Sequence, residues 1–143
     1  MAYPFPSEAW VMALVDVLNS DERYAEVAKK WEGDLVVIIE ADPKEEDADL
    51  PIAFYFDLWH GSCRSARYVD MSKEGIPKAA YVLSTPMANI MRILRGELDP
   101  MQAMLTRKLK VKGNLGYMLR NVPTVLDFVR CCQLVEIADE DKA

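Results

Sequence analysis

A run of five consecutive apolar residues, Leu35 to Ile39, constrains the fold of this chain more than any other feature. A strand with one face in water alternates apolar and polar residues, so an unbroken run predicts a strand buried on both faces. Such a strand needs further strands beside it, and the sequence must supply them.

Four more segments have the character of strands. Ile52–Trp59 is rich in aromatic residues and ends at the turn residues 60–62, after which 64–70 continues as the second arm of a hairpin. Residues 78–83 form the next predicted strand. In 108–112 charged residues alternate with apolar ones, which is typical of an edge strand.

Helical periodicity flanks these strands. Ser7 is a predicted N-cap for a first helix, and the apolar spacing over 24–31 predicts a second. After the fourth strand, Thr85 is the expected cap of a helix with Pro86 in its first turn, and that helix ends at Gly96.

Three more helical segments are expected further on. They begin at Asp99-Pro100, after Gly113-Asn114, and at Pro123-Thr124. The acidic residues 42–49 are predicted to form an exposed loop tip. We expect residues 1–143 to form a single α/β (α+β) domain.

Composition narrows the class of protein. A chain of 143 residues buries enough surface to fold without metal or disulfide. The three cysteines, Cys63, Cys131 and Cys132, are odd in number and two are adjacent, which favours a reducing, cytoplasmic location. We see no signal peptide, and no apolar run approaches the roughly 18 residues that cross a bilayer.

Charge is unevenly distributed along the chain. Residues 92–130 hold eight basic and three acidic residues, a net +5, while the remainder holds nine basic and twenty acidic, a net −11. The overall charge of −6 argues against nucleic-acid binding. The basic part is either an ordinary solvated face or a landing patch for an anionic headgroup, a cofactor phosphate or a membrane.

Methionine is concentrated in the second half. Five of the eight methionines lie in helical stripes after residue 86: Met87, Met91, Met101, Met104 and Met118. These are either ordinary core residues or a deformable wall around an apolar cavity, because methionine adapts to irregular spaces. A 400 Å³ cavity left unfilled would cost on the order of 10 kcal/mol, so such a space must hold ligand or collapse.

Two segments carry a resemblance to a known family. Residues 95–104 read RGELDPMQAM and residues 108–115 read KLKVKGNL. Their order and spacing resemble the signature of the sterol carrier protein 2 (SCP-2) family, in its stand-alone prokaryotic form. Residues 56–61, FDLWHG, resemble that family's aromatic strand and turn. Arg107 departs from the pattern, since the family usually has glycine there.

The resemblance implies a five-stranded mixed sheet, covered on one face by helices, with an apolar tunnel between the layers. It implies non-catalytic binding and intracellular transfer of a fatty acid, fatty acyl-CoA, phospholipid or sterol-like molecule. The last helix, with Phe128 and Val129, would act as a lid. The expected lipid-binding residues are Ile90, Met91, Leu94, Met101, Met104, Leu105, Leu115, Met118, Leu119, Phe128 and Val129.

Within the basic part, we expect Arg107, Lys108 and Lys110 to contact a headgroup or, transiently, a membrane. The resemblance leaves a second role open, in which the protein presents a lipophilic intermediate, such as an isoprenoid quinone precursor, to enzymes.

An enzymatic alternative is a small hydrolase that uses His60 and Cys63, with Asp57 nearby. Catalytic pairs are usually assembled by the fold rather than by sequence proximity, so we give this alternative little weight. Cys131 and Cys132 lack metal-ligand spacing, and we expect neither metal nor cofactor.

Overall fold

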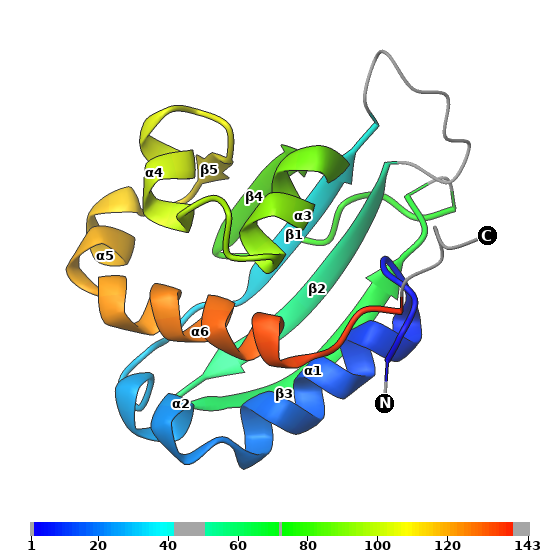
Figure 1. Cartoon of the computed structure of the whole chain (residues 1–143). Coiled ribbons are helices and arrows are strands. Elements are labelled where there is room, and N and C mark those ends of the chain that lie inside the picture. The colour runs from blue at the N-terminus through cyan, green and yellow to red at the C-terminus, as the bar shows by residue number, and fades with distance from the viewer. Residues whose placement is uncertain (1, 42–50, 72, 139–143) are drawn as a thin grey trace.

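The computed structural model describes residues 2–41, 51–71 and 73–138, and its centre is a five-stranded sheet (Figure 1). Its strand order is β3-β2-β1-β4-β5. β1 pairs in parallel with β4, and the other neighbours are antiparallel, so the mixed sheet expected from the sequence is confirmed. The strands are β1 (Leu35–Glu40), β2 (Ile52–Trp59), β3 (Ser62–Val69), β4 (Tyr81–Pro86) and β5 (Lys110–Lys112).

The apolar run is the central strand of that sheet. Val37 and Ile39 belong to the main core beneath the helices. Val36 and Ile38 belong to a smaller cluster on the other face, against which Tyr55, Met71, Ala79 and Val82 pack. The prediction of a strand buried on both faces is therefore confirmed.

All the helices of the described residues lie on one face of the sheet (Figure 1). α1 runs along β3, and α6 crosses in front of the sheet. A bridge between Tyr3 and Ile137 joins the segments next to the two ends. The helices are α1 (Glu8–Ser20), α2 (Glu22–Val27), α3 (Met87–Leu94), α4 (Pro100–Leu105), α5 (Leu115–Arg120) and α6 (Val122–Leu134).

Most of the expected helix starts are confirmed. Ser7 accepts a hydrogen bond from the Trp10 amide, and Asp99 accepts one from the Gln102 amide. The cap expected of Thr85 is wrong. Its hydroxyl donates instead to the Lys108 carbonyl at 2.8 Å, because parallel pairing with β1 extends β4 through Pro86.

Other element bounds also differ from expectation, and the strand predicted over 78–83 begins only at Tyr81. The second helix ends at Val27, and Trp31 lies beyond it, with its indole N–H donating to the Gly33 carbonyl. The edge strand predicted over 108–112 pairs only from Lys110, since the Lys108 carbonyl is taken by Thr85. The acidic segment 42–49 and the acidic end after Ala138 lie outside the described residues.

Candidate ligand-binding cavity

A cavity of about 110 Å³ lies between the sheet and the helices. Strand side chains such as Val37, Phe54 and Phe56 line it on one side, and helical side chains line it on the other. Two threonines also contribute, but their hydroxyls donate to backbone carbonyls, Thr85 to Lys108 and Thr124 to Val27. The wall is therefore almost wholly apolar.

Six of the eleven residues expected to bind lipid line this cavity. They are Ile90, Leu94, Met104, Met118, Phe128 and Val129. The other five do not line it. Met91 lies in a neighbouring groove, and Met101 is half-buried elsewhere. Leu105 is 75% exposed, and Leu115 and Leu119 are each 48% exposed.

The length of α4 and α5 explains why part of the expected wall is missing. Each helix has six residues, little more than one and a half turns, so it turns few side chains toward the core. Met104 and Met118 occupy those inward positions. Apolar spacing alone did not distinguish them from neighbours at the surface.

The aromatic part of the wall was missed from the sequence. Trp10, Tyr24 and Trp31 line the cavity from the N-terminal segments. The helical spacing that includes Tyr24 and Trp31 reads as ordinary core, and no pattern in the sequence singles out Trp10. Phe54 and Phe56 line it from β2, where alternate residues share a face, and that periodicity was the available signal.

The volume of the cavity is small for a long-chain ligand. At roughly 24 cal/mol per Å³, 110 Å³ costs on the order of 3 kcal/mol, which a domain with 5–15 kcal/mol of stability tolerates. A cavity of about 150 Å³ holds a ligand the size of benzene. A long acyl chain therefore requires wall residues to move, and flexible side chains such as Met104 and Met118 allow this.

A second, polar hollow adjoins the cavity. This groove has a volume of about 450 Å³. Leu94 of α3 and Cys132 of α6 line both the groove and the cavity. The groove is lined by Phe5, Met91, Leu94, Arg95, Cys132, Gln133, Val135, Glu136, Ile137 and Ala138.

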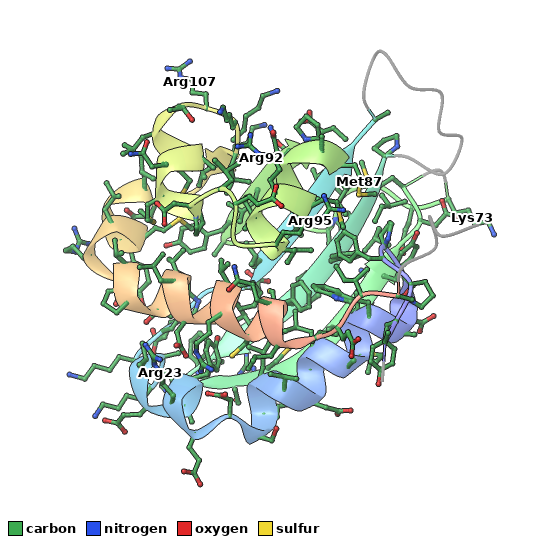
Figure 2. All side chains as sticks on the ribbon, viewed as in Figure 1. Arg23, Lys73, Met87, Arg92, Arg95 and Arg107 are labelled. Carbon is green, nitrogen blue, oxygen red and sulfur yellow. The ribbon has the colours of Figure 1, made fainter. Side chains whose placement is uncertain are left out.

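The three basic residues expected to contact headgroups follow α4. Arg107 (Figure 2) and Lys108 are exposed. Neither forms an ion pair within 4.0 Å with a carboxylate of the described residues. Lys110 forms a long ion pair with Glu40 at 3.7 Å. Arg107 has φ +61°, so the turn keeps the left-handed geometry of a glycine despite the arginine.

The structure does not assemble His60 and Cys63 into a nucleophile–base pair. The Cys63 thiol lies in the core, and burial raises its pKa to about 11. The His60 ring lies at the surface with its Nε2 2.6 Å from Glu32. Asp57 accepts two hydrogen bonds from Arg64. The thiol is therefore protonated and shielded at neutral pH.

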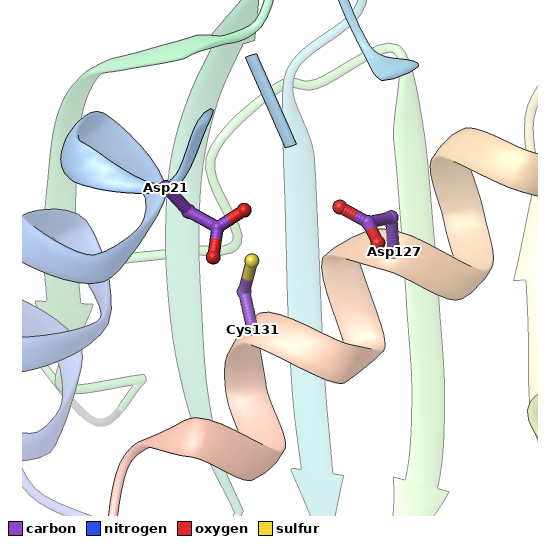
Figure 3. Close-up of side chains that lie close together, drawn as sticks. All are labelled: Asp21, Asp127 and Cys131. Atoms are coloured by element: carbon purple, nitrogen blue, oxygen red, sulfur yellow. The ribbon is translucent and has the colours of Figure 1, made fainter. Parts of the chain in front are cut away.

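A cluster of Asp21, Asp127 and Cys131 has side chains close enough to consider as metal ligands (Figure 3). Arg130 already donates to both carboxylates, at 2.6 Å to Asp21 and 2.8 Å to Asp127. Arg23 lies 3.2 Å from Asp127. Two cations thus balance the two carboxylates, and the cluster acts as an ion-pair network between α6 and the α1–α2 junction.

These features define a class: a small α+β protein whose mixed sheet and single helical layer surround an apolar cavity. Comparison with known families gives a match to the model of the SCP-2 sterol transfer family over residues 14–125. The chain belongs to that family.

Solved structures agree with this assignment. A crystal structure of sterol carrier protein 2 is 31% identical, with a TM-score of 0.80, covering 90% of this chain and 97% of the other. A conserved hypothetical protein of Thermus thermophilus, described as possibly a sterol carrier protein, is 30% identical with a TM-score of 0.80, covering 94% and 91%.

The fold extends to more distant relatives. Sterol carrier protein 2 of Yarrowia lipolytica, in its apo form, is 19% identical with a TM-score of 0.55, covering 85% of this chain and 88% of the other. The search of curated proteins found no match. No helix among the described residues is both long and apolar enough to span a membrane.

Proposed function

We propose that this protein binds an apolar, lipid-like molecule in its cavity and transfers it within the cytoplasm without chemical change. The observation that carries the proposal is the almost wholly apolar wall of the 110 Å³ cavity, in a member of the SCP-2 sterol transfer family. Fatty acids, fatty acyl-CoAs, phospholipids and sterol-like molecules are the candidate ligands. Three free cysteines fit a reducing compartment.

The ligand would contact the six residues named above that line the cavity, together with aromatic side chains of the sheet and the N-terminal segments. Burying a methylene contributes about 0.8 kcal/mol, which favours a long apolar chain. Phe128 and Val129 line the cavity from α6, which supports a role of this helix as a lid. Phe128 packs edge-on against Phe56 at 5.7 Å, so the lid rests directly on the sheet.

Loading and release would take place at an anionic membrane. Residues 100–126 contain five basic residues and no acidic one. Leu105, 75% exposed, lies beside Arg107 and Lys108, so an apolar side chain and two cations can reach the interface together. A cation near an anionic membrane surface contributes about 1 kcal/mol of attraction.

The substitution Met104→Asp tests the cavity. A carboxylate in an apolar wall must be desolvated or neutralised, which costs several kcal/mol, so retention of palmitate should fall at least tenfold. Leu105→Asp is the matched control, because Leu105 is the next residue in the chain but is exposed and lies outside the cavity wall. Native mass spectrometry measures retention, and circular dichroism shows whether each variant folds.

If Met104→Asp retains palmitate as well as the wild-type protein does, the ligand must bind outside this cavity. A wild-type protein that takes up none of the four ligand classes would overturn the proposed function itself.

A further inference from the structure

The polar groove and the apolar cavity meet at a shared boundary. Leu94 from α3 and Cys132 from α6 line both spaces. At this point the two helices are joined by a hydrogen bond from the Gln133 side-chain amide to the Ile93 carbonyl, 2.9 Å long. Leu94 and Cys132 therefore lie where the groove meets the interior, next to this hydrogen bond between the helices.

The two spaces differ in chemistry. The cavity wall is apolar and its two threonine hydroxyls are already engaged. The groove carries Arg95, Gln133 and Glu136. A molecule that occupies both spaces must have an apolar end and a polar end, so the pair of spaces matches an amphiphile.

The volumes of the two spaces also favour a ligand that occupies both of them. The cavity, at about 110 Å³, holds only a short piece of chain, whereas the groove offers about 450 Å³. A long-chain ligand anchored by its tail end would extend through the boundary into the groove. Its head group would then lie among the polar side chains.

Arg95 is the group in the groove best suited to an anionic head group. It caps α3 and is exposed (Figure 2). Among the residues that the structure describes, no carboxylate lies within 4.0 Å of its guanidinium. Arg92, three residues earlier on α3, does not line the groove, so Arg95 is the one basic side chain in the groove lining. Glu136 is the one acidic side chain in the groove lining, and it is exposed.

Resting on the proposed lipid-binding function, we propose that the groove is the mouth of the cavity and that Arg95 binds the anionic head group of the ligand. The head group is a carboxylate or a phosphate on a single long chain. A guanidinium pairs with either through two parallel hydrogen bonds. The carboxylate of Glu136 repels an anionic head group. Removing the charge of Arg95 should therefore lower the affinity for an anionic ligand, and removing the charge of Glu136 should raise it.

Three probes of equal chain length test this: palmitate, palmitoyl lysophosphatidate and the neutral hexadecanol. Binding is followed by the fluorescence of Trp10 and Trp31, which both line the cavity. We expect Arg95→Gln to weaken binding of the preferred anion about tenfold and to change hexadecanol less than twofold. Glu136→Gln should strengthen anion binding two- to threefold. The anion that loses more affinity identifies the head group.

Two further variants separate charge from structure. Arg95→Lys keeps the charge and should keep most of the affinity for the anion. Arg67→Gln removes an exposed arginine of β3, outside the groove and the cavity, and should change nothing. Equal losses for hexadecanol and the anions in Arg95→Gln would overturn the proposed role of Arg95, and so would wild-type binding of all three probes with equal affinity. In both cases lipid binding itself stands, whereas failure of every probe to bind wild type refutes the proposed function.

Discussion

Arg107 shows how a single residue can keep a family's geometry against its own preference. Its φ of +61° lies in the left-handed region, which costs a non-glycine residue about 1 kcal/mol. The turn is held by its neighbours, since the Leu109 amide donates to the Ala103 carbonyl at 3.0 Å. The same turn positions the Lys108 carbonyl to accept a hydrogen bond from the Thr85 hydroxyl.

At this position we predict that Arg107→Gly is more stable than Arg107→Ala by about 1 kcal/mol, because only glycine relieves the left-handed strain. Both variants lose the same charge, so the comparison isolates the backbone. Urea unfolding monitored by circular dichroism measures the difference. An alanine variant as stable as the glycine variant would mean that the turn relaxes without cost.

At the scale of elements, the network around Arg130 holds α6 in place. Asp127 on α6 is only 4% exposed and accepts from Arg130. The same guanidinium donates to Asp21, whose side chain also caps α2. These hydrogen bonds, first the one from Arg130 and then the one from the Tyr24 amide, lower the pKa of Asp21.

We predict that Arg130→Met destabilises the protein by about 3 kcal/mol at pH 7, because it leaves the buried Asp127 carboxylate without its main partner. Arg23→Met is the control. Its side chain is 71% exposed, so it should cost less than about 1 kcal/mol. Denaturant unfolding of the three proteins gives both values, and similar losses in the two variants would contradict the assigned roles.

The difference in stability between wild type and Arg130→Met should depend on pH in a defined direction. The pKa of Asp21 is lower in the folded than in the unfolded protein, so its contribution is complete above the unfolded pKa of about 3.9. It is lost as the pH falls through the lowered pKa. The gap in stability between wild type and Arg130→Met should therefore narrow below about pH 4. A gap that widens there would rule out this linkage.

For the whole molecule, charge asymmetry is the dominant electrostatic feature. The five basic residues of 100–126 stand against a net charge of −11 on the rest of the chain. Near an anionic surface, the electric field orients such a molecule with its basic segment toward that surface. In Figure 2, Arg107 lies at the opposite side of the view from Lys73.

We predict that reversing two charges, Arg107→Glu with Lys108→Glu, slows transfer of a fluorescent lipid to anionic vesicles at least tenfold in low salt. Lys73→Glu with Lys78→Glu reverses the same number of exposed charges outside residues 100–126 and should have little effect. Transfer to neutral vesicles and binding of the lipid should be unchanged in both. Equal, salt-insensitive rates would mean that the basic segment is a solvated face.

Local sequence patterns were sufficient to predict features of the fold that depend on one short segment. The apolar run predicted the central strand, and Ser7 and Asp99 predicted helix starts that the structure confirms. Thr85 shows the limit. Its sequence context fits a helix cap, but Thr85 pairs with Ile39 of β1, which lies 46 residues earlier in the chain, and so belongs to the sheet.

The order and kind of elements follow from local patterns, because hydrophobic period, caps and turn residues act within a few positions of one another. The wall of the cavity, in contrast, depends on how the elements pack together. Leu105, Leu115 and Leu119 have the same apolar character as Met104 and Met118, yet they face outward. Which side of a short helix is buried depends on the sheet and on α6, so contacts distant in sequence determine which residues line the cavity and set Arg95 in the groove that adjoins it.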